Sequence, residues 1–311
     1  MHYKILTTVV LLFGLLLFFD QASAGSLDEA THVLSRKVHI KELIKDSPGA
    51  VIIRTDNEEK LKLMDQNARD LMAIIAVGDR IDVNIDDNNL DTIKDLKSIE
   101  RPISNVQRSA ALGIAFSVIF VLATLAARLK PLDYIIGADN RYSNSKLQMV
   151  LWFSALMTVY LATLGLRVAI WGWDFLGGVG LTENLLSLSG FSILTYGAAK
   201  AITQQQANTL ANSLAVVTAK DGIAEIIATP SMTKDFFRNN DGKLDLGDTQ
   251  MFFISLLVVA IFLLLSFQFL GWITYAKKIT LPDIDTTLLA IFGLGQGAYL
   301  IKKAATPFGK G

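Results

Sequence analysis

The chain has 311 residues, 51% of them hydrophobic, and a mean hydropathy of +0.41. Soluble domains are typically about 45–50% apolar, so a membrane protein is the first hypothesis. The 29 basic and 29 acidic residues balance, which gives no electrostatic reason to expect a nucleic-acid partner. Cysteine is absent, which excludes disulfides, thiolate metal sites and a nucleophilic cysteine.

The N-terminus has the layout of a secretory signal peptide. A basic start precedes an apolar run at 5–19, and small residues follow at Ala22 and Ala24. This pattern predicts that residues 1–24 are a signal peptide cleaved after Ala24, with an uncleaved signal anchor as the alternative. In both cases the next segment, residues 25–107, is expected outside the membrane.

Residues 25–107 mix charged residues with short apolar runs, which predicts a small exported, soluble α+β domain. Segments 38–44 and 67–77 have helix-like apolar spacing. Segments 50–53 and 80–85 are β-rich, the second with clean alternation, and predict strands.

Five apolar runs follow, and each is expected to form a membrane-spanning helix of roughly 20 residues. They cover residues 109–127, 147–173, 184–201, 251–275 and 287–301. Arg128 and Lys130 come directly after the first run, and basic residues accumulate on the cytoplasmic side. We therefore expect residues 108–130 to cross a cell (inner) membrane from outside to inside, and the C-terminus to be cytoplasmic.

Two later stretches resemble each other, which predicts two parallel two-helix repeats at 131–203 and 233–306. Asp133-Tyr134-Ile135 matches Asp235-Phe236-Phe237 at an offset of 102 residues, and Gly190 matches Gly293 at an offset of 103. Two spans per repeat place both copies in the same orientation. Residues 204–232 would then be a cytoplasmic connection, and residues 307–311 a cytoplasmic tail.

Each predicted repeat opens with an acidic turn on the cytoplasmic side. Aspartate and asparagine favour turns, and Ser143 and Asp245 are suitable N-caps for the helices that follow. Capping explains most of this pattern, although a functional role is the alternative. The repeated turn residues are Asp133, Asp139, Asp235, Asp241 and Asp245.

Polar and small residues recur in the second, third and fifth spans. Such residues let helices approach closely and form hydrogen bonds, so helix packing is the simpler explanation and a polar pore the sharper one. Arg167 is expected near the outer surface, where Asp174 or Glu183 could pair with it. The pore or helix-interface candidates are Gln148, Gln250, Ser189, Ser192, Tyr196, Gly293, Gln296, Gly297 and Tyr299.

No catalytic constellation or cofactor motif is present, so we expect neither an enzyme nor a bound cofactor. Asp86, Asp87 and Asp91 are weak candidates for calcium, against a solvent-exposed acidic turn. Residues 239–245 resemble the start of an EF-hand loop, but Phe237 stands where a carboxylate ligand belongs, and a turn is expected there.

The sequence thus predicts a mainly α, polytopic helical membrane protein with two parallel repeats, one preceding helix and the exported domain. Its first functional hypothesis is a homo-oligomeric channel for ions or small solutes, gated or capped by the exported domain. The alternative is an envelope sensor or scaffold whose exported domain binds a ligand or protein partner. The lipid bilayer is the expected surrounding in both cases.

Overall fold

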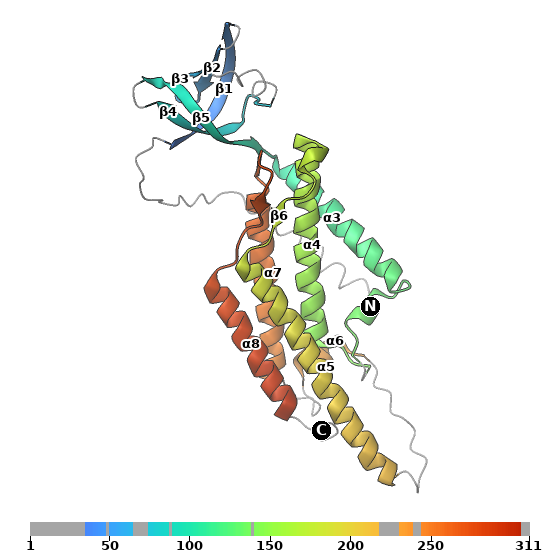
Figure 1. Cartoon of the computed structure of the whole chain (residues 1–311). Helices are drawn as coiled ribbons and strands as arrows, with labels where there is room; N and C mark the ends of the chain where they lie inside the picture. The colour runs from blue at the N-terminus through green and yellow to red at the C-terminus, as the bar shows by residue number, and fades with distance from the viewer. Residues whose placement is uncertain are drawn as a thin grey trace. The chain divides into compact units, whose positions relative to one another are not determined.

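A computed structural model of the chain describes residues 35–47, 50–64, 74–86, 89–137, 140–217, 230–238 and 244–305 (Figure 1). The predicted signal peptide lies outside these residues. The chain divides into two compact units. One contains the described residues up to Ala110 with Leu164–Gly178 and Phe267–Ile279, and the other contains Ala111–Thr163, Val179–Ser266 and the described residues from Thr280 onward.

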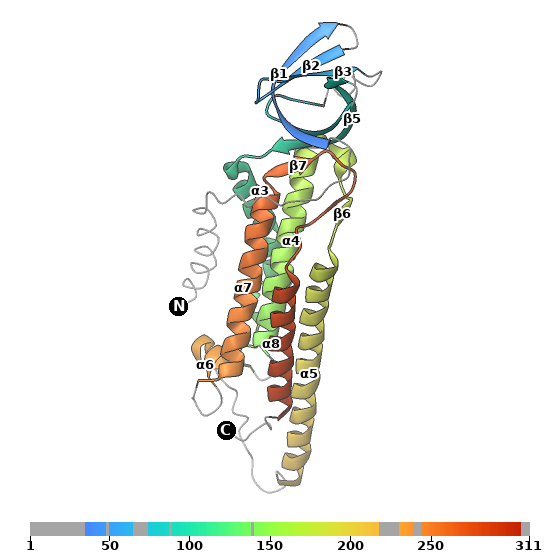
Figure 2. The same cartoon turned by 90° about the vertical axis from the view of Figure 1, so that its left-hand side faces the viewer.

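The first unit is organised around a β-barrel, whose strands curve around one another in Figure 2. The sheet order is β3-β2-β1-β4-β5-β7, and an additional parallel pairing of β3 with β5 closes five of the strands into a ring. A five-stranded Greek-key barrel of this order has the topology of the OB-fold. The strands are β1 (Ser35–Ser47), β2 (Ala50–Thr55), β3 (Lys60–Met64), β4 (Arg80–Asp86), β5 (Asn89–Pro102) and β7 (Trp272–Thr274).

Alternating side chains fill the barrel, as expected for strands with one buried face. In β4, Ile81, Val83 and Ile85 are buried, while the residues between them are partly exposed. The strands predicted at 50–53 and 80–85 are therefore confirmed as β2 and β4. The helix predicted at 67–77 falls largely outside the described residues.

The helix predicted at 38–44 is wrong, because these residues lie in β1. Val38 and Ile40 are buried on the barrel side, but the register against β2 shifts between Ile40 and Glu42. Such a β-bulge adds one residue to the strand and breaks its alternation. The next apolar residue is consequently Leu43, three positions after Ile40, which imitates helical spacing.

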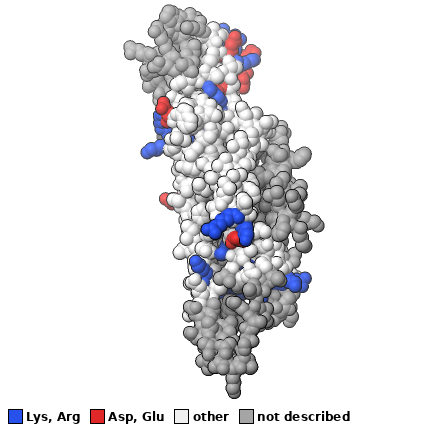
Figure 3. Space-filling view, turned by 90° about the vertical axis from the view of Figure 1, so that its right-hand side faces the viewer, with Lys and Arg blue, Asp and Glu red and all other residues white. Residues whose placement is uncertain are grey.

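Among the described residues, four helices are long and apolar enough to cross a membrane, which is compatible with an integral membrane protein. The face in Figure 3 agrees, since broad uncharged areas separate its Lys, Arg, Asp and Glu side chains. The four are α3 (Asn105–Ala126), α4 (Asn144–Trp171), the Glu183–Gln205 part of α5 (Glu183–Val217) and α7 (Leu246–Phe269).

The fifth predicted span forms a helix, α8 (Thr286–Ala305), but it is not among these four. Gln296 and the two lysines at its end reduce its apolar character. Figures 1 and 2 both show α8 beside α5, and the two helices pack together in the second unit. A Cβ added at Gly293 would meet the ring of Phe191 at 3.6 Å, an ordinary van der Waals distance, so this approach does not depend on glycine at that position.

The predicted fourth span at 251–275 is too long at its end. Helix α7 stops at Phe269, and Trp272–Thr274 forms β7 against the end of β5. The apolar run continues past the helix because Ile273 is 1% exposed in the first unit. Apolar sequence alone does not distinguish a helix end from a buried strand.

Short elements connect the helices. A 3-10 turn, η1 (Pro131–Tyr134), lies between α3 and α4, and α6 (Met232–Phe237) precedes α7. The remaining elements are η2 (Trp173–Phe175), β6 (Val179–Gly180) and β8 (Ile279–Thr280), of which β6 and β8 pair.

Candidate functional site

Two turns meet at one end of the second unit, the region where the sequence placed its repeated acidic motif. Asp235 accepts hydrogen bonds from the backbone N–H of Tyr142 at 3.0 Å and of Ser231 at 2.9 Å. The Asn144 side chain donates to the carbonyl oxygen of Phe236 at 3.5 Å and to that of Asp248 at 3.4 Å. These hydrogen bonds connect the turn before α4 to the turn before α7.

The turns use corresponding backbone bonds. The N–H of Ser143 donates to Ile135 at 2.8 Å, and the N–H of Asp245 donates to Phe237 at 2.8 Å. An isolated β-bridge closes each turn, between Ile136 and Tyr142 and between Arg238 and Leu244. Each pair of equivalent positions differs by the offset of 102 that relates the two sequences.

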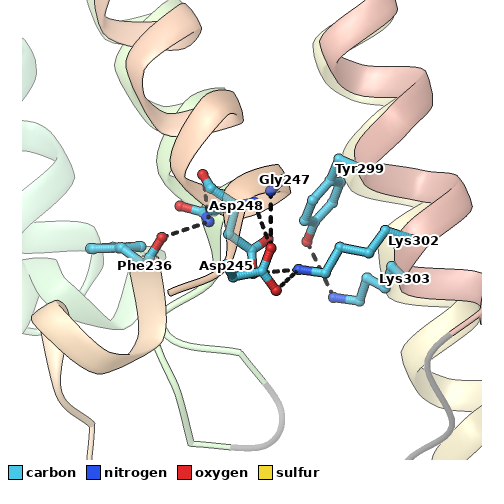
Figure 4. A network of polar contacts seen from close by, with 8 residues as sticks. Phe236, Asp245, Gly247, Asp248, Tyr299, Lys302 and Lys303 are labelled. Carbon is cyan, nitrogen blue, oxygen red and sulfur yellow. Dashed lines mark hydrogen bonds and ion pairs between the residues drawn. The ribbon is translucent and has the colours of Figure 1, made fainter. Parts of the chain in front are cut away.

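Asp245 caps α7, as the sequence predicted. Its Oδ1 accepts the N–H groups of Gly247 at 3.0 Å and Asp248 at 3.2 Å, which satisfies two donors of the first helical turn. Lys302, near the end of α8, forms ion pairs with Asp245 and with Asp248, the latter at 2.8 Å (Figure 4). We call Asn144, Asp245, Asp248 and Lys302 the polar clasp.

The charges of Asp245 and Lys302 stabilise each other. Burial by itself raises the pKa of Asp245, but its hydrogen bond and ion pair with Lys302 and the two backbone N–H groups outweigh burial and lower it. Burial likewise lowers the pKa of the Lys302 ammonium, but the two carboxylates outweigh burial and raise it. Both groups are therefore charged at neutral pH.

We expect the ion pair of Asp245 to stabilise the protein only above acidic pH. Its pKa is lowered on folding, so the contribution is complete above the ordinary value of 3.8 and disappears as the pH falls through the folded value. Thermal unfolding of the full chain and of Asp245→Asn checks this, because asparagine also caps helices. The difference in unfolding temperature should be constant from neutral pH to about pH 5 and shrink below pH 3.8. A difference that grows in acid would contradict it.

At alkaline pH, the stability of the fold should fall because Lys302 loses its proton. Because the pKa of Lys302 is raised on folding, its contribution is complete below the ordinary value of 10.5 and is lost as the pH rises through the folded value.

Three of the pore or helix-interface candidates form contacts between α4 and α5. The indole N–H of Trp152 donates to Ser189 at 2.9 Å, and the Gln148 amide donates to Ser192 at 3.5 Å. Ser189 and Ser192 in turn donate to carbonyl oxygens of their own helix. These contacts match the helix-packing interpretation.

The other candidates occupy varied positions. Gln250 is exposed although its counterpart Gln148 is 2% exposed, so the two glutamines do not share a role. Gln296 and Tyr299 are buried, and Tyr299 packs beside Ala199 and Met251. Tyr196 and Gly293 are partly buried, and Gly297 is exposed.

Several predicted site residues are not brought into the clasp. Asp133 is exposed in η1, whereas Asp139, Asp241 and Asp87 lie outside the described residues, as do the side chains of Asp86 and Asp91. Within the described ranges, no group of three or more His, Cys, Asp or Glu could hold a metal ion.

Sequence reasoning missed three members of the clasp, Asn144, Asp248 and Lys302. Lys302 was overlooked because the repeat comparison selected Lys303, and its carboxylate partners lie 54 or more positions earlier in the chain. Asn144 was overlooked because its counterpart, Leu246, is apolar. Only the difference between the copies could have singled it out.

No known protein family, curated protein or solved structure matches the chain.

Proposed function

We propose that this is an integral membrane protein that acts as an envelope sensor or scaffold, in which the barrel binds a ligand or protein partner. The observation that carries this proposal is strand β7. It follows α7 after only two residues, and it pairs with β5 through Glu100–Thr274, Arg101–Ile273 and Pro102–Trp272. Part of the barrel sheet is therefore supplied by the end of a membrane-spanning helix.

A second helix is joined to the same strands. The chain passes from β5 into α3 through Ile103 and Ser104, and the N–H of Ile103 donates to the carbonyl oxygen of Gly271 at 2.9 Å. Ser104 and Gln107 form a capping box, in which Ser104 Oγ accepts the Gln107 N–H and Gln107 accepts the Ser104 N–H at 3.0 Å. A rearrangement of β5 would therefore move the first turn of α3 and the last turn of α7 together.

The topology that we propose follows the charge pattern of the sequence. The barrel would lie outside a cell (inner) membrane, and Arg128, Lys130 and the C-terminus would lie in the cytoplasm. The corresponding backbone bonds of the two turns support an internal repeat at 131–203 and 233–306.

A homo-oligomeric channel is the second candidate. Its support is the pair of buried amide oxygens of Gln148 and Gln296, neither of which has a hydrogen-bond donor among the described residues. Buried acceptors of this kind can face water or a cation in a polar path. The bonds of Gln148, Ser189 and Ser192 between helices favour packing within one chain, which places this function second.

The sensor-or-scaffold function predicts coupling between the barrel and its two helix ends. The ring of Trp272 in β7 lies under Arg80, whose Cζ is 3.9 Å from the ring centroid, and it meets the His39 ring edge to face at 5.4 Å between centroids. In the full chain, Trp272→Ala should speed hydrogen exchange in the first turn of α3 and the last turn of α7. The control Lys41→Ala, which removes an exposed ion pair with Glu58, should not.

Flux through liposomes containing the full chain separates the two candidates. We expect no passage of ions or small solutes. A selective flux together with unchanged exchange in Trp272→Ala would overturn the proposal in favour of the channel.

A further inference from the structure

Arg167 carries a positive charge whose side chain is fully buried near the end of α4. Its Nε donates to the carbonyl oxygen of Phe175 at 3.3 Å, and its Nη2 donates to those of Ala276 at 2.8 Å and Lys277 at 3.2 Å. These acceptors are neutral. Within the described part of the chain the guanidinium has no carboxylate partner, although the sequence offered Asp174 or Glu183 as one.

Two hydrogen-bond donors remain unsatisfied on this face of α4. Nη1 of Arg167 and Nε1 of Trp171 are both buried, and neither has an acceptor among the residues that the structure describes. Residues four apart on a helix lie on the same face. Both side chains also lie near Phe175, whose ring centroid is 5.8 Å from Arg167 Cζ and 6.5 Å from the Trp171 ring centroid.

Buried donors without acceptors are costly, and so is a buried cation without a counter-ion. Here the unsatisfied donors and the unpaired positive charge lie on the same face of α4. A single group with several acceptor oxygens and a negative charge would satisfy both. A carboxylate or a phosphate would supply both the acceptors and the charge, whereas a water molecule would supply acceptors without the charge.

Further positive charge lies beside this face. Lys277 Nζ is 4.4 Å from the centroid of the same Phe175 ring and donates to the carbonyl oxygen of Asp174 at 3.1 Å. Lys277 and Lys278 are exposed, and neither forms an ion pair with a described residue. These are the two lysines that the proposed topology leaves on the outer side, against the usual charge bias.

The loop next to these lysines exposes apolar side chains. Trp173 is 78% exposed and Leu176 is 58% exposed. Tryptophan is enriched where membrane meets water, and basic pockets at that level bind lipid headgroups. The surroundings therefore favour a ligand that combines an anionic group with an apolar body.

We propose that Arg167, Trp171, Lys277 and Lys278 form a binding site for a phosphate group, supplied by the headgroup of an anionic phospholipid. Arg167 Nη1 and Trp171 Nε1 would donate to phosphate oxygens in charge-assisted hydrogen bonds. The two lysines would add positive charge at the exposed side of the site, where the ligand enters.

Ligand-induced thermal stabilisation of the full chain in detergent tests the site, since a ligand that binds the folded state raises the unfolding temperature. Phosphatidylglycerol, phosphatidylcholine and inorganic phosphate are titrated separately. Because Arg167 also holds two loops, the informative variants are Trp171→Phe, which removes one N–H donor and keeps an aromatic ring, and Lys277→Gln with Lys278→Gln. Trp173→Phe is the matched control.

We expect phosphatidylglycerol to stabilise the protein at lower concentration than phosphatidylcholine. Trp171→Phe and the double lysine variant should each raise the half-saturating concentration by about tenfold or more, as loss of a hydrogen bond to a charged group does. The Trp173→Phe control should leave it unchanged.

Stabilisation by inorganic phosphate with the same dependence on Trp171 and the lysines supports the site and assigns its ligand to free phosphate instead of lipid. Equal half-saturating concentrations in the wild type and all variants, or no stabilisation by any of the three ligands, overturns the proposal.

Discussion

Replacing Arg101 by methionine should lower the stability of the first unit by about 3–5 kcal/mol, the range found when one partner of a buried ion pair is removed. Arg101 Nε and Nη2 donate to the two carboxylate oxygens of Asp79 at 3.0 and 2.9 Å. Nη2 also donates to the carbonyl oxygen of Ile74 at 2.7 Å. The Arg101 side chain is 28% exposed, but that of Asp79 is only 2% exposed, so the variant would leave a buried carboxylate without its counter-ion.

The loss of stability should extend beyond the ion pair of Arg101 and Asp79. The Arg101 guanidinium lies 4.4 Å from the centroid of the Trp171 ring, and Trp171 packs against the barrel core. Residue 101 also pairs with Ile273 in β7. Thermal unfolding of the full chain, combined with hydrogen exchange of β4 and β5, measures the effect.

Arg54→Met is the matched control for this prediction. Arg54 pairs with Glu42 at 2.9 Å, but the two side chains are 37% and 52% exposed. Exposed ion pairs contribute roughly 0–1 kcal/mol, so the control should change little. If the two variants lost equal stability, the buried ion pair of Arg101 with Asp79 would stabilise the protein no more than the exposed pair of Arg54 with Glu42.

Local pattern was sufficient for much of the fold. Strand β4 was predictable because Ile81, Val83 and Ile85 alternate with polar residues, and the long apolar helices because their apolar runs are long. Pattern failed where one residue disturbs the period, as at the bulge after Ile40 in β1. It failed again at β7, which completes a sheet whose neighbouring strand ends 170 positions earlier, at Pro102 opposite Trp272.

The candidate site shows the same division. Capping by Asp245 was predictable, because a cap bonds to the helix that directly follows it. The link from Asp248 to Lys302 joins α7 to α8, and no local pattern encodes it. Gln148 and Gln250 match in sequence but differ in burial, since similarity of sequence does not fix which neighbours pack on each copy.

Replacing Lys302 by methionine should destabilise the second unit by about 1.5–3 kcal/mol, the contribution of one hydrogen bond to a charged group. Two such contacts are lost, but the Lys302 side chain is 34% exposed, so solvent screening reduces their combined effect. The variant leaves Asp245 and Asp248, with side chains 10% and 17% exposed, facing each other without the shared cation. Thermal unfolding of the full chain at neutral pH measures the loss. Lys303→Met, one residue further along α8, is the control and should cost clearly less.

A second substitution tests whether the repulsion of the two carboxylates is the cause. In the Lys302→Met background, Asp245→Asn removes one negative charge and keeps a good helix cap. The double variant should therefore be more stable than Lys302→Met alone, while Asp245→Asn alone is less stable than the wild type. Additive losses in this double-mutant cycle would contradict the coupling. They would mean that Lys302 stabilises the unit through the packing of its aliphatic chain rather than through its charge.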